Sequence, residues 1–349
     1  MPTHAVTREQ GEEAHDALTR AGGNVTAAAA ELGMSPSTLR NRLKRSEQLY
    51  GPMTPAQFSV DAEVEDDADI DDIRARRHRE FQRKSAKVSA DRQIDVRLDC
   101  SGPFGLVVLG DTHWDNPGSD LPTYERHAEC ILATDGLFVG HIGDVLDNWV
   151  GRLERLYAEH TTTPTEGWKL AEYYLRELSP KLLFLSGGNH DGWSGHRDPL
   201  RYIVRGTEIV YRQHRTRIRL LQKREPMLTV NARHAFSGRS MYNNAHAALR
   251  ELLFGCRDDI AICGHYHTSG VSVTKDPESG RKLTGVLVGS YKIHDEYAMA
   301  RGFADQNLSP SVAFIVNPAL EAAHPDRVTL WWDPLEGADY LTFLRGKAQ

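Results

Sequence analysis

The feature that most constrains the fold of this chain is a series of five polar motifs, each of which closely follows a short apolar run. The runs are residues 104–109, 137–142, 182–185, 227–230 and 260–263, and the motifs are Asp111-Thr112-His113, Gly143-Asp144-Val145-Leu146-Asp147, Gly188-Asn189-His190-Asp191, His234 and Gly264-His265-Tyr266-His267. Short apolar runs bounded by glycine and polar residues are typical of buried strands. Because ligands of open α/β sheets bind beyond the carboxyl ends of the strands, we expect the five motifs to converge on one crevice.

The residue types in these motifs are those of metal ligands. Two Asp carboxylates, an Asn carbonyl oxygen and four imidazoles form a mixed oxygen and nitrogen set without a thiolate. This set is too large for one tetrahedral ion, which takes four ligands. Two divalent ions about 3.5 to 4 Å apart could share it and hold the attacking and leaving oxygens of a phosphoryl displacement. The motifs therefore predict metal-assisted phosphoester hydrolysis.

In type and order, the motifs resemble those of the calcineurin-like metallophosphoesterases, which are D-x-H, G-D-x-x-D, G-N-H-D/E, H and G-H-x-H. The resemblance extends from about residue 103 to about residue 334. It implies that the first ion is bound by Asp111, His113 and His267, that the second is bound by Asn189, His234 and His265, and that Asp144 bridges the two. It also implies that His190 protonates the leaving oxygen and is oriented by the carboxylate of Asp147.

His234 belongs to no longer motif, and the neighbouring His246 competes for its role. We assign the role to His234 because it follows the strand-like run that ends near residue 231. Three other histidines, His141, His196 and His294, are expected to be structural or solvated. Trp114 and Trp193 stand beside the motifs and are expected to line the substrate cleft, whereas Trp331 and Trp332 are expected to pack in a sheet.

The expected fold is an α/β sandwich of two sheets flanked by helices. Helical patterns at residues 124–133, 153–178, 199–204 and 245–253 alternate with the strands, which favours a layered α/β architecture. Strand-like runs at 283–288, 312–316 and 328–332 are expected to form the second sheet. The family resemblance makes Mn²⁺ the first ion to test, although imidazole and carboxylate ligands also accept Fe²⁺, Zn²⁺ or Co²⁺.

The first fifty residues predict a small helical domain. Residues 7–22 have the pattern of an amphipathic helix, and Ser35 and Pro36 are suited to the N-cap and first turn of a second helix. Two short helices joined by a turn that contains glycine are typical of a helix-turn-helix. Residues 22–43 resemble the Fis-type helix-turn-helix of bacterial regulators, which implies that Gly33 makes the turn and that the second helix enters the major groove of DNA.

The candidate DNA contacts lie on this second helix: Ser37, Arg40, Asn41, Lys44 and Arg45. Arg and Asn can read base edges, and Lys44 or Arg45 can bind phosphate. The net charge of −6 is not evenly spread, because four of the six basic residues in the first fifty lie on this helix. A single unit of this kind binds DNA weakly, so we expect a homodimer or a tethering role. The alternative is a helical hairpin used for protein contact.

The charge pattern divides the chain into a helix-turn-helix domain at residues 1–50, a charged linker at 51–92 and a catalytic domain at 93–349. Eight acidic residues crowd into residues 61–72, a composition typical of disorder. Residues 73–87 then predict a basic helix, which either follows a nucleic-acid backbone or is a solvated face. Residues 93–98 are expected to begin the sheet.

Composition restricts the class of protein further. The 349 residues are 40% hydrophobic and 26% charged, as in a globular protein. The four cysteines form no C-x-x-C pair, which favours a reducing compartment, and we expect a cytoplasmic location. Neither a signal peptide nor an apolar run long enough to cross a membrane is present in the sequence, so we expect no membrane association.

The motifs predict the reaction type and leave the substrate open. The attached DNA-binding module favours a DNA-directed nuclease, similar to SbcD-like repair nucleases and to metallophosphoesterases of phages and prophages. Only about eighty residues follow the last motif, however, which leaves little room for the capping domain of the SbcD-like enzymes. The alternatives are a small-molecule or cyclic-nucleotide phosphodiesterase or nucleotide hydrolase, and, outside the enzymes, a DNA-binding regulator whose phosphoesterase domain senses a ligand.

Overall fold

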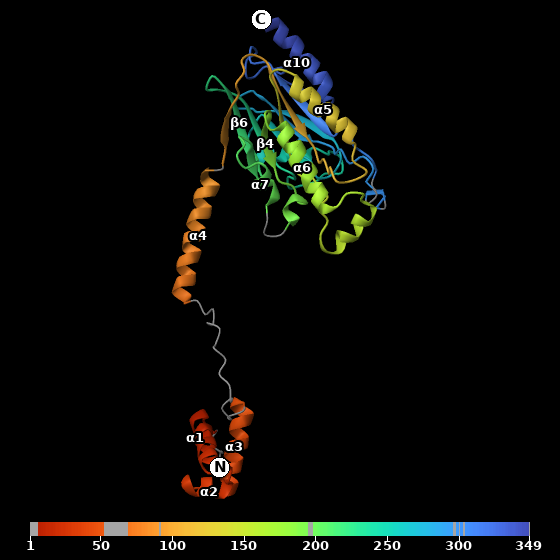
Figure 1. Cartoon of the computed structure of the whole chain (residues 1–349). Coiled ribbons are helices and arrows are strands. Elements are labelled where there is room, and N and C mark those ends of the chain that lie inside the picture. The colour runs from red at the N-terminus through yellow and green to blue at the C-terminus, as the bar shows by residue number, and fades with distance from the viewer. Residues whose placement is uncertain are drawn as a thin grey trace. The chain divides into compact units, whose positions relative to one another are not determined.

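The computed structural model describes residues 6–51, 69–90, 92–194, 198–295, 298–299, 301–302 and 304–348 (Figure 1). The chain divides into two compact units, Met1–His78 and Arg79–Gln349. Residues 61–68 of the acidic run and His196 lie outside the described residues. The domain boundaries expected at residues 50 and 92 stay predictions.

The first unit contains a bundle of three short helices, α1 (Arg8–Arg20), α2 (Val25–Glu31) and α3 (Pro36–Tyr50). Each begins at a polar cap: the side chains of Thr7, Asn24 and Ser35 accept hydrogen bonds from backbone N–H groups of the first turn. Helix α2 was not predicted as a separate helix. The core of the bundle is small and consists of Ala14, Ala17, Ala28, Ala29 and Leu39. Because alanine side chains are short, the three helices can pack closely.

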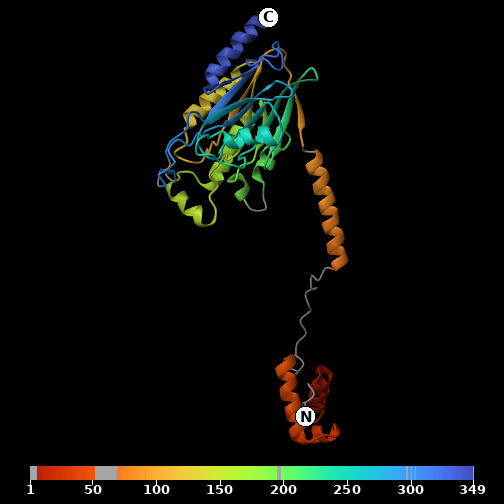
Figure 2. The ribbon, with the colours of Figure 1, turned by 180° about the vertical axis from the view of Figure 1, so that it is seen from behind.

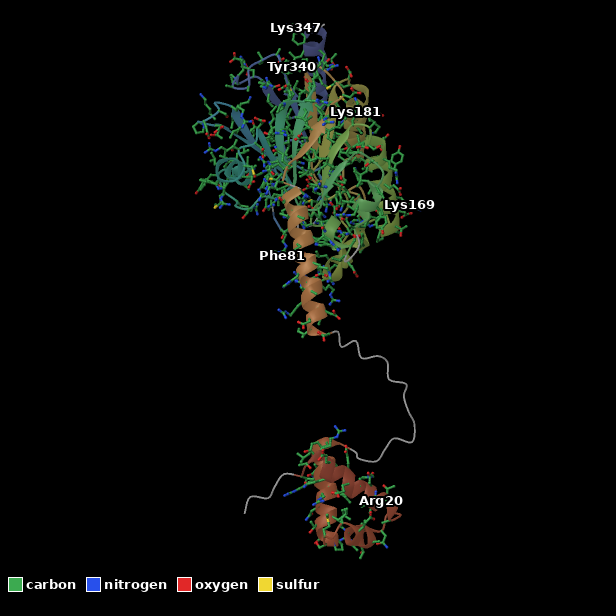
Figure 3. The ribbon with its side chains drawn as sticks, turned by 90° about the vertical axis from the view of Figure 1, so that its left-hand side faces the viewer. Arg20, Phe81, Lys169, Lys181, Tyr340 and Lys347 are labelled. Atoms are coloured by element: carbon green, nitrogen blue, oxygen red, sulfur yellow. The ribbon has the colours of Figure 1, made fainter. Side chains whose placement is uncertain are left out.

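Helix α4 (Ile70–Ala90) covers the predicted basic helix at 73–87. Nearly all of its described residues are exposed, and the Phe81 side chain is 72% exposed. Figure 3 shows side chains that extend from α4 around its circumference, with Phe81 labelled. The helix is therefore an exposed, basic element.

The second unit is built on two six-stranded mixed sheets within the described chain. In spatial order the first sheet contains β1 (Ile94–Arg97), β6 (Thr216–Gln222), β7 (Glu225–Ala232), β8 (Ile260–Cys263), β10 (Lys282–Leu287) and β9 (Gly270–Lys275). The second contains β12 (Val328–Trp331), β11 (Ser311–Val316), β2 (Phe104–Leu109), β3 (Leu137–His141), β4 (Leu182–Ser186) and β5 (Val210–Arg212). Strands β2, β3, β4 and β5 are mutually parallel, as are β7, β8 and β10.

The main core lies between the two sheets. It joins residues of β2 and β11, such as Leu106 and Phe314, to residues of β7 and β8, such as Val230 and Ile262. The outer face of the second sheet packs against α5 (Leu121–Ala133), α6 (Pro164–Leu178), α7 (Pro199–Ile203) and α10 (Pro334–Ala348). Helix α8 (His246–Phe254) packs on the first sheet, and Figure 2 shows it in front of that sheet. This arrangement confirms the predicted two-sheet α/β sandwich.

Two expectations drawn from the sequence are wrong. The three runs at 283–288, 312–316 and 328–332 do not form one sheet, because β10 pairs with β8 in the first sheet while β11 pairs with β2 in the second. The single helix expected at 153–178 is divided into η1 (Gly151–Glu159), a 3₁₀ helix, and α6. The break occurs because Thr163 caps a new helix that has Pro164 in its first turn. Helix α10 was not predicted.

Candidate metal centre

The five motifs lie beyond the carboxyl ends of five strands that belong to both sheets. Strands β2, β3 and β4 carry Asp111, Asp144 and Asn189, whereas β7 and β8 carry His234 and His265. Parallel strands end at the same edge of a sheet, so the motifs of each sheet gather at one edge. The hydrogen bond from the His265 backbone N–H to Asp111 Oδ2, 2.7 Å long, joins the two edges. The expected convergence on one crevice is therefore present.

The loops at this edge adopt unusual backbone conformations. Four residues of the motifs have positive φ angles: His113 (42°), Asp144 (51°), His265 (73°) and His267 (51°). Such conformations cost on the order of 1 kcal/mol each for residues other than glycine and gather at functional sites. Glycine is required beside them, because a Cβ atom at Gly188 would lie 2.0 Å from Asp144 Oδ1. The backbone at this edge is thus shaped around the carboxylate of Asp144.

One group of ligating side chains consists of Asp111, His113 and His267, with donor atoms within 4.8 Å of one another. The Nε2 atoms of the two histidines face each other at 3.3 Å. Asp111 Oδ2 lies 3.4 Å from His267 Nε2, and Asp111 Oδ1 is buried without a hydrogen-bond partner among the described residues. These residues are the set expected for the first ion.

A second group consists of Asp144, His234 and His265, again within 4.8 Å. His234 Nε2 lies 3.1 Å from His265 Nδ1 and 3.0 Å from Asp144 Oδ2. Asn189 Oδ1 joins this group at 2.9 Å from His234 Nε2. The group corresponds to the set expected for the second ion. His246 belongs to neither group and lies in the first turn of α8.

In three of these imidazoles, the ring nitrogen that points away from the ligand group, Nδ1, lies near an oxygen acceptor. His113 Nδ1 lies 2.7 Å from Asp147 Oδ1, and His234 Nδ1 lies 3.0 Å from the Ile142 carbonyl oxygen. His267 Nδ1 lies 3.5 Å from Asp295 Oδ2. Histidines that bind metal commonly donate their other N–H in this way, which directs the lone pair of the remaining nitrogen inward. A cation between the facing nitrogens would stabilise this arrangement, so the donor set fits divalent metal.

The electrostatics of the site also suit a cation. Burial alone would lower the pKa of His234, but the carboxylates of Asp144 and Asp111 raise it to about 10. Burial opposes the rise at His267 as well, yet its contacts with Asp111 and Asp295 raise its pKa to about 9. Both shifts show that the interior of the site favours positive charge, because the carboxylates are buried with few other partners.

The expectation that the carboxylate of Asp147 orients His190 is wrong, because a different atom of Asp147 makes the contact. His190 Nδ1 donates instead to the backbone carbonyl oxygen of Asp147, at 2.5 Å. The Asp147 carboxylate is instead held by His113, by Lys292 Nζ at 3.2 Å and by His160 Nε2 at 3.2 Å. Burial opposes its ionisation, but the charge and hydrogen bond of His113 hold the pKa of Asp147 well below its usual range. Asp147 therefore positions His113, while its backbone positions His190.

Several polar residues around the site were not predicted from the sequence. Lys292, His160 and Asp295 belong to no motif, and only the fold brings them to the site. Asp191 lies within a motif, so the sequence could have indicated that it belongs to the site. Its carboxylate accepts hydrogen bonds from the backbone N–H groups of Asp144, Val145 and Gly188. It therefore holds two of the motif loops together.

The aromatic residues near the site divide into two kinds. Trp114 is only 1% exposed and packs against Tyr124 in the core, so the expectation that it lines the cleft is wrong. The ring of Trp193 lies 4.1 Å from that of His190, and Trp149 contacts the same imidazole at 4.9 Å. Trp149 was not predicted. Both indole rings therefore pack against the imidazole of His190. His141 is buried and bonded to Thr112 and Gly143, as expected for a structural histidine.

Helix α3 of the first unit presents all five candidate DNA contacts on its surface. Ser37, Arg40, Asn41, Lys44 and Arg45 are exposed, whereas Leu39 is buried in the small core. Ser37, Arg40, Asn41 and Lys44 follow the i, i+3, i+4, i+7 spacing of one helix face. The face opposite the core is therefore polar and basic.

Comparisons with known proteins give one local match and several remote ones. Residues 15–45 match the model of the HTH_8 family, described as bacterial regulatory protein, Fis family, so this stretch is a Fis-type helix-turn-helix. A search of curated proteins gave no match. Among the described residues, no helix is both long and apolar enough to cross a membrane.

Three solved structures illustrate the remote matches. A conserved protein from Streptococcus pneumoniae TIGR4, described as a predicted phosphoesterase, is similar at 12% identity and a TM-score of 0.29, over 67% of this chain and 100% of that one. The calcineurin-like phosphoesterase YfkN from Bacillus subtilis matches at 10% identity and a TM-score of 0.35, over 70% of this chain and 99% of that one. A metallophosphoesterase from Sphaerobacter thermophilus matches at 15% identity and a TM-score of 0.34, over 70% of this chain and 95% of that one.

Proposed function

We propose that the second unit is a metal-dependent phosphodiesterase that binds two divalent ions and acts on DNA brought to it by the helix-turn-helix. The observation that carries this proposal is the pair of facing imidazole contacts, His113 with His267 and His234 with His265, each beside a buried carboxylate. In the proposal Asp111, His113 and His267 would hold one ion, Asn189, His234 and His265 would hold the other, and Asp144 would be shared by both. Mn²⁺ is the first ion to test.

The bound ions would supply Lewis acidity, which polarises the phosphoryl group and lowers the pKa of an attacking water. In the hydrolysis a P–O bond forms to the oxygen of the attacking water, which releases a proton to solvent, and the P–O bond to the leaving oxygen breaks. His190 gives its Nε2 proton to that oxygen, because its Nδ1 is held by the Asp147 carbonyl oxygen. Trp149 and Trp193 pack against the His190 ring and restrict its orientation.

The proposed substrate follows from the first unit. A helix with Arg40, Asn41 and Lys44 on one exposed face has the groups that bind base edges and phosphates in the major groove. We propose that this unit, as a dimer or as a tether, brings the phosphodiesterase to DNA. The exposed basic helix α4 carries charge of the same sign.

The test is a Mn²⁺-dependent cleavage assay on single-stranded and double-stranded DNA, with bis-p-nitrophenyl phosphate alongside. The Asp144→Asn variant is the control for contaminating nucleases. Cleavage of DNA that is lost in the variant is the expected result. Hydrolysis of the small diester alone would identify a small-molecule phosphodiesterase, and DNA binding without any hydrolysis would identify a regulator.

A further inference from the structure

The loop between β7 and α8 has an exposed apolar tip, residues 237–242. Phe236, before the tip, is 4% exposed and belongs to the core on which α8 packs. Asn243, after the tip, donates from Nδ2 to a serine hydroxyl of β9 at 2.9 Å. Between these anchors Met241 is 92% exposed and Tyr242 is 95% exposed, the highest values among the large hydrophobic side chains that the structure describes. Two adjacent apolar side chains held in solvent on an anchored loop suit contact with another molecule.

Two side-chain contacts connect this tip to the candidate metal centre. The guanidinium carbon of Arg239 lies 4.1 Å from the centre of the Tyr266 ring. Tyr266 belongs to the fifth motif, and its ring lies 4.8 Å from the ring of His265. Tyr242 follows Arg239 by three residues, so their Cα atoms are at most about 11 Å apart. The tip is therefore within reach of a chain molecule that is bound at the metal centre.

The charge of this part of the chain suits an anion. From residue 226 to residue 250 the sequence contains three arginines, Arg233, Arg239 and Arg250, and no acidic residue. Arg239 is exposed at the tip, and a cation–π contact with Tyr266 holds it there. A guanidinium group on an aromatic face still presents N–H donors at its edge, and these suit phosphate oxygens. The tip therefore combines a cation that can bind phosphate with an exposed aromatic ring.

We propose that the tip binds an unpaired nucleic-acid strand that continues from the metal centre, with a base stacked on Tyr242 and a phosphate on Arg239. This inference rests on the proposed function and specifies its substrate as a strand with unpaired bases beside the scissile phosphate. Proteins that bind single strands combine aromatic rings, on which bases stack, with cations that pair with phosphates. A base within a duplex is already stacked, so the tip selects an unpaired strand. A small diester does not extend to the tip.

The test measures how the full chain binds a single-stranded oligonucleotide, by fluorescence anisotropy without added metal. In Tyr242→Ala the dissociation constant should rise roughly five-fold to 100-fold, the range expected for one lost stacking contact. An abasic oligonucleotide of equal length should bind this variant and the wild type alike, because it has no base to stack. In Arg239→Gln the dependence of log K on log salt should become shallower by about 0.7, the value for one phosphate on a single strand.

The matched control is the pair Tyr202→Ala and Arg205→Gln. These residues are also a tyrosine and an arginine three positions apart on the surface of the second unit, and Tyr202 is 72% exposed. The control pair should bind the oligonucleotide as the wild type does. With Mn²⁺, the pair Arg239→Gln and Tyr242→Ala should lower kcat/KM for the oligonucleotide through KM, with bis-p-nitrophenyl phosphate unaffected.

Binding and hydrolysis separate failure of this inference from failure of the proposed function. If the wild type hydrolyses neither substrate with Mn²⁺, the proposed function is wrong, whereas base-dependent binding that Tyr242→Ala loses would still support the tip. Strand binding that is undetectable in the wild type, unchanged in Tyr242→Ala or lost equally in the control pair would overturn the inference and favour a protein partner, while diester hydrolysis still supports the metal centre. An equal loss for the abasic strand, or for the small diester, would also reject it.

Discussion

The two units of this protein differ in how far apart in the sequence their functional residues lie. The helix-turn-helix matches a family model over residues 15–45, and its candidate DNA contacts all belong to α3. The residues of the candidate metal centre follow five strands in two sheets and extend in the sequence from Asp111 to His267. Asp295, still further along the chain, contacts His267. One site is therefore local and depends on a small alanine-rich core, whereas the other exists only when a large domain has folded. This difference predicts that the two functions can be lost separately.

The largest expected effect comes from a substitution in the candidate metal centre. Asp144→Asn removes the carboxylate that lies 3.0 Å from His234 and leaves the first unit untouched. Hydrolysis of bis-p-nitrophenyl phosphate should fall to the level without enzyme, because the two proposed ions would lose their shared ligand. Affinity for DNA, measured by fluorescence anisotropy without added metal, should match that of the wild type. A parallel loss of DNA affinity would show that the two units are not independent.

Substitution of His190 tests the chemistry apart from the metal ligands. His190→Ala should lower kcat by roughly 100-fold to 10,000-fold, the usual contribution of general acid catalysis, with the bound metal unchanged. Turnover of the small diester and metal content by mass spectrometry are the two measurements. His246→Ala is the matched control, since His246 belongs to neither ligand group. Equal activity of the two variants would reject His190 as the proton donor.

A smaller effect is expected from the local site. Arg40→Ala should weaken DNA binding by about 1 to 3 kcal/mol if Arg40 reads a base edge, and kcat for the small diester should not change. Arg8→Ala removes the same charge from α1, where Arg8 pairs with Glu12 on the surface, and serves as the control. Binding curves for both variants at two salt concentrations give the comparison. If the two variants bind alike, then α3 does not read DNA through this face.

The smallest effect concerns the stability of the helical unit. Ser35→Ala removes the side chain that accepts from Thr38 N–H at 3.1 Å, which should cost about 1 kcal/mol. Hydrogen exchange of the α3 amides in the full chain should speed up accordingly, while exchange in β2 and β8 stays the same. Ser85→Ala on the exposed face of α4 is the control. Faster exchange in the strands as well would mean that the units unfold together.

Sequence patterns predicted the features that depend on neighbouring residues. Strands β2 and β8 have the expected bounds because apolar runs end there at glycine and polar residues. The grouping of the motif residues at one edge followed from the rule for parallel strands. The α3 N-cap and the buried position of Leu39 also follow from residues close in the chain.

Features that depend on distant contacts were not predictable in the same way. The sequence of β10 does not show that it pairs with β8, since both runs are largely apolar. Lys292 and His160 reach Asp147 from separate loops, and no local pattern marks them. These two side chains and His113 hold the Asp147 carboxylate, and His190 contacts the backbone carbonyl oxygen of Asp147 instead. The burial of Trp114 was missed for the same reason, because it depends on the packing of α5 and α6.

The most direct test of a two-metal centre is the number of metal ions bound by the full chain. The protein is saturated with Mn²⁺, freed of excess ion by gel filtration, and analysed by inductively coupled plasma mass spectrometry, with Asp144→Asn in parallel. The geometry of the two ligand groups predicts two ions per chain in the wild type and a loss of at least one in the variant. One ion or none in the wild type, with no change in the variant, would contradict a two-metal phosphodiesterase.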